Sequence, residues 1–291
     1  MNKILITGAN GQLGNEVRRQ AANFPDFEYV FTDIQELDLS NPEAVDAFIR
    51  QTRPKYVINC AAYTAVDVAE SDDELARLLN TKVPAWIGKI GRTYDCRIVH
   101  ISTDYVFDGT GCVPYTEDDM TSPESVYGKT KLNGEIALLK ENPTAVVIRT
   151  AWLYSIFGNN FVKTMLRLGR ERDSLKVVYD QVGTPTCAAD LARAILHIIS
   201  RSAAGQTAWT PGIFHYTNEG VCSWYDFAKA IHEFGGISCR ISPVATSEYP
   251  TPAKRPSYSV LSKEKIKTVY GMEIPYWRDS LQKCIEELSI K

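Results

Sequence analysis

The feature that most constrains the fold of this chain is a short apolar run at residues 3–7 that leads directly into the glycine-rich string GANGQLG at residues 8–14. Apolar residues then recur at the spacing of one helix face, at Leu13, Val17 and Ala21. A strand, a tight glycine turn and a helix in this order open a nucleotide-binding βαβ unit. We therefore expect Gly8, Gly11 and Gly14 to let the backbone approach a pyrophosphate, whose charge the helix N-terminus stabilises.

Strand and helix patterns then alternate through the first half of the chain. Four further apolar runs have the length of strands, at residues 28–32, 56–59, 97–103 and 145–149. Ser40 with Glu43 resembles a capping box at the start of a helix, and another helix is expected near Val83. Alternating units of this length predict an α/β fold built on a Rossmann-type, doubly wound parallel sheet with helices on both faces.

The pattern changes after Arg149, and this change suggests how the chain is divided. The periodicity weakens there, while aromatic residues and prolines become more frequent. We expect residues 1–150 to form a dinucleotide-binding Rossmann domain and residues 151–291 to form mainly a smaller substrate-binding lobe. Segments within about 185–217 are expected to return to the sheet.

Asp33 ends the second expected strand, about 20 residues after the glycine turn. A carboxylate at this point can accept hydrogen bonds from the ribose hydroxyls of a dinucleotide and repels a 2′-phosphate. No arginine follows at once in the sequence, so NADH is favoured over NADPH as the cofactor. The alternative role for Asp33 is that of a loop acid or a helix cap.

Tyr127 and Lys131 are four residues apart at the start of an expected helix, so both side chains lie on one face of it. A nearby ammonium group favours the phenolate, so we expect Lys131 to lower the pKa of Tyr127 from its usual value of about 10. A phenol tuned in this way is a general acid or base for the interconversion of a carbonyl and an alcohol. The alternative is an ordinary pair on an exposed helix, and the glycine turn makes it the weaker interpretation.

Two other strand ends carry candidates. Thr103 ends the strand at 97–103, where its hydroxyl could bind a substrate carbonyl and hold it against Tyr127; a simple turn residue is the alternative. The small residues within 60–64, after the strand at 56–59, fit close passage of a cofactor across the edge of the sheet.

The second half of the chain offers fewer candidates. Lys163 and Arg255 are candidate clamps for a nucleotide diphosphate because a cation can bind phosphate, although each is equally well a solvated surface charge. Trp152 is favoured as a substrate contact over three other tryptophans, which we expect to be core residues: Trp209, Trp224 and Trp277.

Several strings together resemble the dTDP-4-dehydrorhamnose reductases, a family of extended short-chain dehydrogenases/reductases, whose glycine motif is also spaced G-x-x-G-x-x-G. They are ITGANGQLG, NCAAYTAVDVAE, STDYVFDG, SVYGKTKLNGE, RTAWLYS, GNNFVKTML, DQVGTPT and YPTPAKRPSYSVL. The resemblance runs from about Lys3 to beyond Leu261, nearly the whole chain.

The resemblance implies a role for individual residues. Tyr127 would donate the proton, Lys131 would also hold the nicotinamide ribose, and Thr103 would polarise the keto oxygen. The pyrophosphate would pass Gly11, Gln12 and Leu13. The adenosine would lie among Asp33, Asp38 and Leu39, and the nicotinamide side would be lined by Ala62, Tyr63 and Thr64. The sugar nucleotide would touch Thr103, Asp104 and Trp152.

Composition excludes several other classes of function. A net charge of −3 with interspersed signs gives no basic face for nucleic acid and no polybasic membrane anchor. The seven cysteines are scattered and the four histidines lie far apart, so we expect reduced thiols, no metal site and a cytoplasmic protein without a signal peptide. The oligomeric state stays open, with a homodimer as one alternative.

The reaction that the resemblance implies is the reduction of the C4 keto group of dTDP-4-dehydro-L-rhamnose to dTDP-L-rhamnose by NADH or NADPH. Two alternatives stay open at this point. One is another sugar-nucleotide reductase or epimerase, because these enzymes share the Tyr/Lys pair and the fold. The other is a non-catalytic protein like the regulatory subunit of methionine adenosyltransferase, which the presence of Thr103, Tyr127 and Lys131 disfavours.

Overall fold

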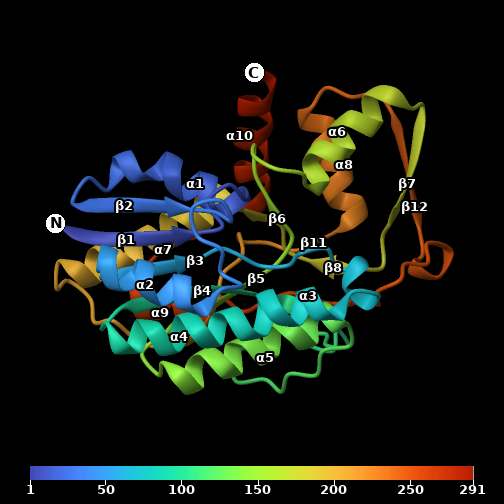
Figure 1. Cartoon of the computed structure of the whole chain (residues 1–291). Coiled ribbons are helices and arrows are strands. Elements are labelled where there is room, and N and C mark those ends of the chain that lie inside the picture. The colour runs from blue at the N-terminus through green and yellow to red at the C-terminus, as the bar shows by residue number, and fades with distance from the viewer. Residues whose placement is uncertain (291) are drawn as a thin grey trace.

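The computed structural model describes residues 1–290, and within them one sheet of six parallel strands forms the centre of the fold (Figure 1). The strands follow the order β10-β5-β4-β3-β1-β2. Their bounds are β1 (Asn2–Thr7), β2 (Phe27–Thr32), β3 (Tyr56–Asn59), β4 (Arg97–Thr103), β5 (Val146–Thr150) and β10 (Gly212–His215). The predicted α/β class with a parallel sheet is confirmed. The strand order reverses direction between β1 and β3, and a doubly wound sheet binds its ligand outside the carboxyl ends of the strands at such a point.

Consecutive apolar side chains of a strand point to opposite faces of the sheet, so both faces are covered by helices. Ile4 and Ile6 of β1 belong to one buried cluster, whereas Leu5 belongs to another. The first cluster includes residues of α1 (Gln12–Gln20), α7 (Ala188–Ala203) and α9 (Glu264–Tyr270). The second includes residues of α2 (Pro42–Thr52), α4 (Val83–Thr93) and α5 (Val126–Glu141). A strand of period two thus buries one side chain in each layer of helices.

The start of α2 differs from the expected capping box. Asn41, not Ser40, is the N-cap residue, and its side-chain oxygen accepts a hydrogen bond from the backbone N–H of Ala44 (3.0 Å). Pro42 occupies the first helical position, where its missing N–H leaves no hydrogen bond unmade. The helix was predicted, but its cap was placed one residue too early.

A second group of elements lies at the upper right of Figure 1, beside the sheet. It comprises α6 (Phe161–Glu171), β7 (Ser174–Val178), α8 (Trp224–Phe234) and β12 (Arg240–Val244), and β7 pairs with β12 in parallel. Its apolar cluster centres on Phe227 and includes Trp277 and Leu281 of α10 (Trp277–Ile290).

Two short ladders join this group to the rest of the chain. β6 (Leu153–Tyr154) pairs in parallel with β9 (Thr186–Cys187), and β8 (Val182–Gly183) pairs antiparallel with β11 (Cys222–Ser223). The remaining short helical segments are η1 (Ala21–Asn23), η2 (Val68–Glu70), α3 (Asp73–Arg77), the π-helical turn η3 (Leu78–Lys82), η4 (Asp104–Val106) and η5 (Thr246–Glu248). None of the helices within residues 1–290 has the length and apolar character needed to cross a membrane.

Candidate active site

A cavity of about 540 Å³ lies at the carboxyl ends of β1, β3, β4 and β5. It collects most of the predicted site residues: Gly8, Gly11, Gln12, Leu13, Ala62, Thr64, Thr103, Asp104, Tyr127, Lys131 and Trp152. The other predicted residues do not line it: Gly14, Asp33, Asp38, Leu39, Tyr63, Lys163 and Arg255. The strand order accounts for the position of the cavity, which opens where the sheet reverses its winding.

The glycine turn has the geometry of a phosphate cradle. Gly8 has a left-handed backbone (φ 62°), and a Cβ added there would lie 2.8 Å from the backbone of Ala61. A Cβ on Gly14 would lie 2.5 Å from Cα of Ala9. Both positions therefore need glycine, and the turn delivers the backbone N–H groups at the start of α1 to the cavity floor. These residues fit the pyrophosphate of a dinucleotide.

Asp33 lies beside this turn rather than in the cavity. Its carboxylate accepts a hydrogen bond from the backbone N–H of Asn10 (2.9 Å), so it ties the end of β2 to the glycine turn. Asp38 is exposed, and hydrogen bonds from Ser40 lower the pKa of its carboxyl. Leu39 is buried in the core layer that includes α2.

Lys131 is held in one position by the helix that carries it. Ser125 caps α5 by accepting a hydrogen bond from the backbone N–H of Gly128 (3.1 Å). The Lys131 side chain is only 2% exposed, and its Nζ donates to the backbone carbonyl of Ile101 on β4 (2.6 Å). Burial lowers the pKa of Lys131 to about 8, although the carboxylate of Glu135 acts in the opposite direction.

The predicted lowering of the Tyr127 pKa is wrong for this structure. Burial raises the pKa of Tyr127 to about 12; a hydrogen bond with the Thr103 side chain lowers it, and the charge of Asp104 raises it further. Lys131 does not reverse this shift because its Nζ is held at the Ile101 carbonyl. Tyr127 is therefore a protonated phenol at neutral pH.

Thr103 and Asp104 form a short polar chain next to Tyr127. The Thr103 hydroxyl donates to the Asp104 carboxylate (2.9 Å) and accepts from the backbone N–H of Tyr105 (3.2 Å). Asp104 is 2% exposed, and burial raises the pKa of its carboxyl to about 6 against hydrogen bonds from Ser259 and Thr103 that lower it. The Tyr105 ring also packs edge-on against Tyr127, with centroids 5.5 Å apart.

The segment after β3 is held by hydrogen bonds with Asn80, a residue that the sequence analysis did not single out. Asn80, fully buried in η3, accepts from the backbone N–H of Tyr63 (2.9 Å) and donates to its carbonyl (3.0 Å). The same Asn80 amide donates to the Thr130 hydroxyl on α5 (3.2 Å). Asn80 thus holds the cavity wall that contains Ala62 and Thr64 against the helix that contains Tyr127.

The two predicted phosphate clamps lie outside the cavity lining. Lys163 Nζ donates to the carbonyl of Gly158 (2.9 Å), a residue that does line the cavity. Arg255 makes an ion pair with Asp67 (2.6 Å) and lies behind Tyr105 in a separate small pocket. Each cation is therefore already bound to an oxygen of the chain itself.

The chain is similar to known proteins in both sequence and fold. The profile of the family described as RmlD substrate binding domain matches residues 1–290. A dTDP-4-dehydrorhamnose reductase of Burkholderia thailandensis is 41% identical over 298 residues, which cover 98% of this chain and 99% of that one. The chain belongs to this family.

Solved structures of the family agree. A dTDP-4-dehydrorhamnose reductase ortholog from Clostridium acetobutylicum has a TM-score of 0.93 and 47% identity, with 99% of each chain covered. The dTDP-4-dehydrorhamnose reductase of Bacillus anthracis, solved in complex with NADP, also has a TM-score of 0.93, at 35% identity, with 99% of this chain and 100% of that one covered. The predicted enzyme class, a nicotinamide-dependent reductase of this family, is confirmed.

Family membership leaves the keto sugar itself open. A Streptomyces antibioticus protein described as a probable dTDP-4,6-dihydroxy-2-methyloxan-3-one 4-ketoreductase is also 41% identical, over 287 residues that cover 98% of this chain and 95% of that one. Relatives at equal identity thus carry the names of reductases for different dTDP-linked keto sugars.

Sequence reasoning assigned no role to one part of the cavity wall. Gly158, Asn159 and Asn160 line it, and the Asn160 amide donates to the Gln12 side chain at the start of α1 (3.0 Å). The string GNNF contributed to the family resemblance, but nothing in its spacing indicated that it would meet the glycine turn. A contact across 148 residues has no local signal in the sequence.

Proposed function

We propose that this protein reduces the C4 keto group of dTDP-4-dehydro-L-rhamnose to give dTDP-L-rhamnose, with Tyr127 as the proton donor. The observation that carries the proposal is the convergence of Thr103, Tyr127 and Lys131 with the glycine turn on one cavity. A reductase needs a proton donor and a dinucleotide site within reach of the same carbonyl, and the family membership is consistent with this arrangement.

The nicotinamide, when bound, supplies the hydride. The residues of this chain then have three tasks. Tyr127 gives its phenolic proton to the oxygen at C4, and its raised pKa keeps that proton in place at neutral pH until the oxygen becomes basic. Thr103 orients the same oxygen through its hydroxyl. Lys131, fixed at the Ile101 carbonyl, would hold the nicotinamide ribose with its positive charge and its remaining hydrogen-bond donors.

The substrate then lies between the sheet and the second group of elements. We assign residues 1–150 to the cofactor, residues 151–291 mainly to the sugar nucleotide, and contacts with the sugar to Asp104 and Trp152. Both residues line the same cavity as the glycine turn. For Lys163 and Arg255 to bind the diphosphate, each would exchange its present partner for a phosphate oxygen. The case for Arg255 is weaker because its present partner is a charged carboxylate, which is harder to displace than a backbone carbonyl.

The assay that tests this function compares two keto sugars. Oxidation of NADH and of NADPH is followed with dTDP-4-dehydro-L-rhamnose and with dTDP-4,6-dihydroxy-2-methyloxan-3-one. The proposal predicts a kcat/KM at least tenfold higher for the first. The reverse preference would assign the chain to the substrate named for the Streptomyces relative.

The cofactor preference that we propose is NADH over NADPH. Asp33 ends β2 beside the glycine turn, where its charge opposes a 2′-phosphate. Asp33→Ala should therefore raise the ratio of kcat/KM for NADPH to that for NADH, and Asp33→Asn, which keeps an acceptor for the Asn10 N–H, separates the charge from the hydrogen bond. If both variants leave the ratio unchanged, Asp33 does not select the cofactor.

The same assay decides between this function and the two alternatives. An epimerase would retain tightly bound oxidised cofactor through purification and would not consume reduced cofactor. A regulatory subunit would show no turnover with either keto sugar. Asp104, Thr103 and Tyr127 form a connected polar chain in the cavity, which a non-catalytic protein does not require.

A further inference from the structure

Trp152 has a backbone conformation that a bulky aromatic residue rarely adopts. Its φ is 48°, in the left-handed region, where the side chain crowds the backbone. Such a conformation persists only where the surrounding structure holds it, and it gathers at ligand sites. Here Trp152 lies between the end of β5 at Thr150 and the start of β6 at Leu153, and the backbone N–H of Thr186 donates to its carbonyl (3.2 Å).

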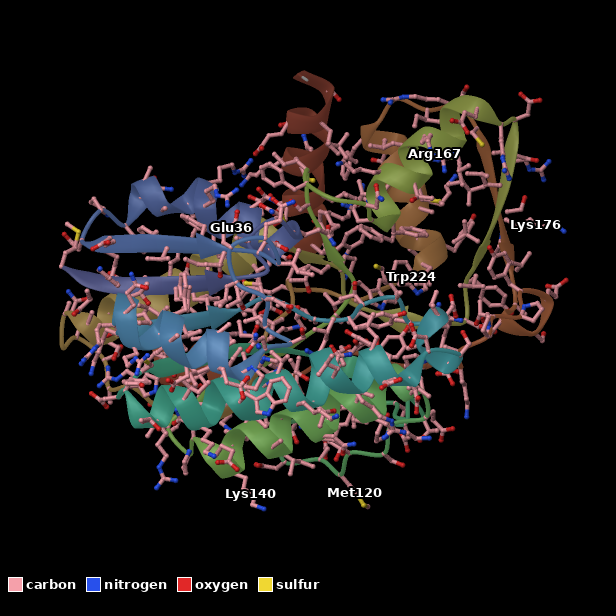
Figure 2. All side chains as sticks on the ribbon, viewed as in Figure 1. Glu36, Met120, Lys140, Arg167, Lys176 and Trp224 are labelled. Atoms are coloured by element: carbon pink, nitrogen blue, oxygen red, sulfur yellow. The ribbon has the colours of Figure 1, made fainter. Side chains whose placement is uncertain are left out.

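The indole of Trp152 is stacked on a second indole. The rings of Trp152 and Trp224 lie 3.7 Å apart between centroids, at an interplanar angle of 13°. Trp224 is the first residue of α8, and Phe161 of α6 packs on it at 4.6 Å. Figure 2 shows Trp224 at the lower end of α8, close to the level of β8 and β11 in Figure 1. The sequence prediction that Trp224 is only a core residue therefore missed its contact with a residue of the cavity wall.

The Trp152 indole packs against Gly183, in space that a larger side chain at that position would occupy. A Cβ on Gly183 would lie 2.7 Å from Oγ of Ser259 and 2.8 Å from both Cε2 and Cζ2 of Trp152. The β8–β11 ladder brings the two supports together, because Gly183 pairs with Cys222, two residues before Trp224. Gly183 does not have a left-handed backbone, so its lack of a side chain is required by the indole and by the Ser259 hydroxyl beside it, and not by the turn.

We propose that Trp224 and Gly183 position the Trp152 indole as a rigid wall of the cavity, against which the flat face of a sugar or a pyrimidine base of the sugar nucleotide packs. Trp224 is then a positioning residue, since it acts through Trp152. The wall contains no residue of the glycine turn, so we expect it to affect the sugar nucleotide and not the dinucleotide. The identity of the ligand rests on the proposed function, whereas the stacked arrangement does not.

The test uses three variants of the full chain: Trp224→Leu removes the stack, Trp224→Phe keeps an aromatic ring, and Gly183→Ala displaces the indole. Loss of an aromatic contact should raise KM for dTDP-4-dehydro-L-rhamnose, and Kd for dTDP-L-rhamnose by calorimetry, about three- to tenfold in Trp224→Leu and Gly183→Ala. Trp224→Phe should recover most of the affinity, and Kd for NADH should stay within about twofold. Trp209→Phe, which loses an indole that packs on Tyr56, is the matched control.

A second readout does not depend on activity. Two stacked indoles couple their electronic transitions, so wild-type protein should show an exciton couplet in circular dichroism that Trp224→Leu and Trp224→Phe lose and Trp209→Phe keeps. A couplet that survives in Trp224→Leu, or unchanged KM and Kd in variants that have lost it, would overturn the proposal. If wild-type protein does not bind dTDP-L-rhamnose, the proposed function and the ligand named here are both wrong. This outcome is seen with wild-type protein alone, so it is distinct from a failure of the variants.

Discussion

Burial acts on Tyr127 and Lys131 in opposite directions, and both shifts favour the uncharged side chain. The pKa of Tyr127 rises to about 12 and that of Lys131 falls to about 8, because each charged form loses the hydration that water would give it. At neutral pH Tyr127 still keeps its proton and Lys131 still keeps most of its charge, so Tyr127 is set for proton donation rather than for proton abstraction. This differs from the phenolate that the i, i+4 spacing alone predicts, because spacing says nothing about burial.

Tyr127→Phe should lower kcat by about 10²–10⁴-fold while leaving the fold and the Kd for NADH almost unchanged, because it removes the donated proton and little else. Tyr94→Phe is the matched control: it removes a phenol that bonds to Asp46 on α2, away from the cavity lining, and should leave kcat unchanged. The measurement is steady-state kinetics with direct cofactor titration. Comparable kcat values for the two variants would remove Tyr127 from the mechanism.

Asp104 makes the stability of the protein depend on pH. Its carboxyl has a pKa of about 6 when folded and about 3.8 when unfolded, so the folded state binds the proton more tightly. This contribution to stability is complete below pH 3.8 and is lost as the pH rises through 6.

We therefore expect the free energy of unfolding of wild-type protein to fall relative to that of Asp104→Asn between pH 4 and pH 7. The two pKa values correspond to a loss of roughly 3 kcal/mol at most. Urea unfolding of both proteins at several pH values measures the difference. If it stays constant with pH, burial does not raise the pKa of Asp104.

At the scale of elements, two glycines of α5 allow this helix to pack closely against the backbone of its neighbours. A Cβ on Gly134 would overlap the carbonyl oxygen of Asn80 in η3, and a Cβ on Gly128 would overlap that of Tyr105 in η4. Both obstacles are backbone atoms, which cannot turn aside as a long side chain can. The close packing brings Tyr127 and Lys131, which α5 carries, to the carboxyl end of β4.

Gly134→Ala should therefore destabilise the protein by about 1–3 kcal/mol, as overpacking does, and should lower kcat by displacing Tyr127 and Lys131. Alanine is the better helix former, so helix propensity alone predicts the opposite sign. Asn133→Ala, at an exposed position of the same helix, should change stability by no more than about 0.5 kcal/mol. Denaturant unfolding and kinetics compare the two, and an equal effect would mean that α5 can move away from η3.

The elements that the sequence predicted are those with a local cause. Short apolar runs predicted β3 and β4 at their observed bounds, and the glycine string predicted the turn before α1. The cap of α2 was misplaced because Ser40 and Asn41 are both good capping residues, and only the hydrogen bond to Ala44 distinguishes them. Short ladders such as β8–β11 were not predicted because two-residue strands leave no periodicity.

At the scale of the whole molecule, the two groups of elements meet through contacts between residues distant in the chain. The Ser155 hydroxyl donates to the buried carboxylate of Glu16 on α1 (2.6 Å), and Asn160 donates to Gln12 (3.0 Å). These bonds attach the wall of the cavity that follows β5 to the helix that begins at the glycine turn. Bonds of this kind cannot be derived from local patterns, and the family resemblance assigned no role to Ser155, Glu16 or Asn160.

The central claim is that this cavity transfers a hydride to C4 of a dTDP-linked 4-keto sugar while Tyr127 protonates the oxygen. The most direct measurement supplies reduced nicotinamide carrying deuterium at the transferred position together with dTDP-4-dehydro-L-rhamnose, and follows the product by NMR. Wild-type protein should give dTDP-L-rhamnose with deuterium bound to carbon 4 of the sugar, and Tyr127→Phe should form it at least about 10²-fold more slowly. Cofactor that keeps its deuterium, or product labelled at another carbon, would contradict this claim.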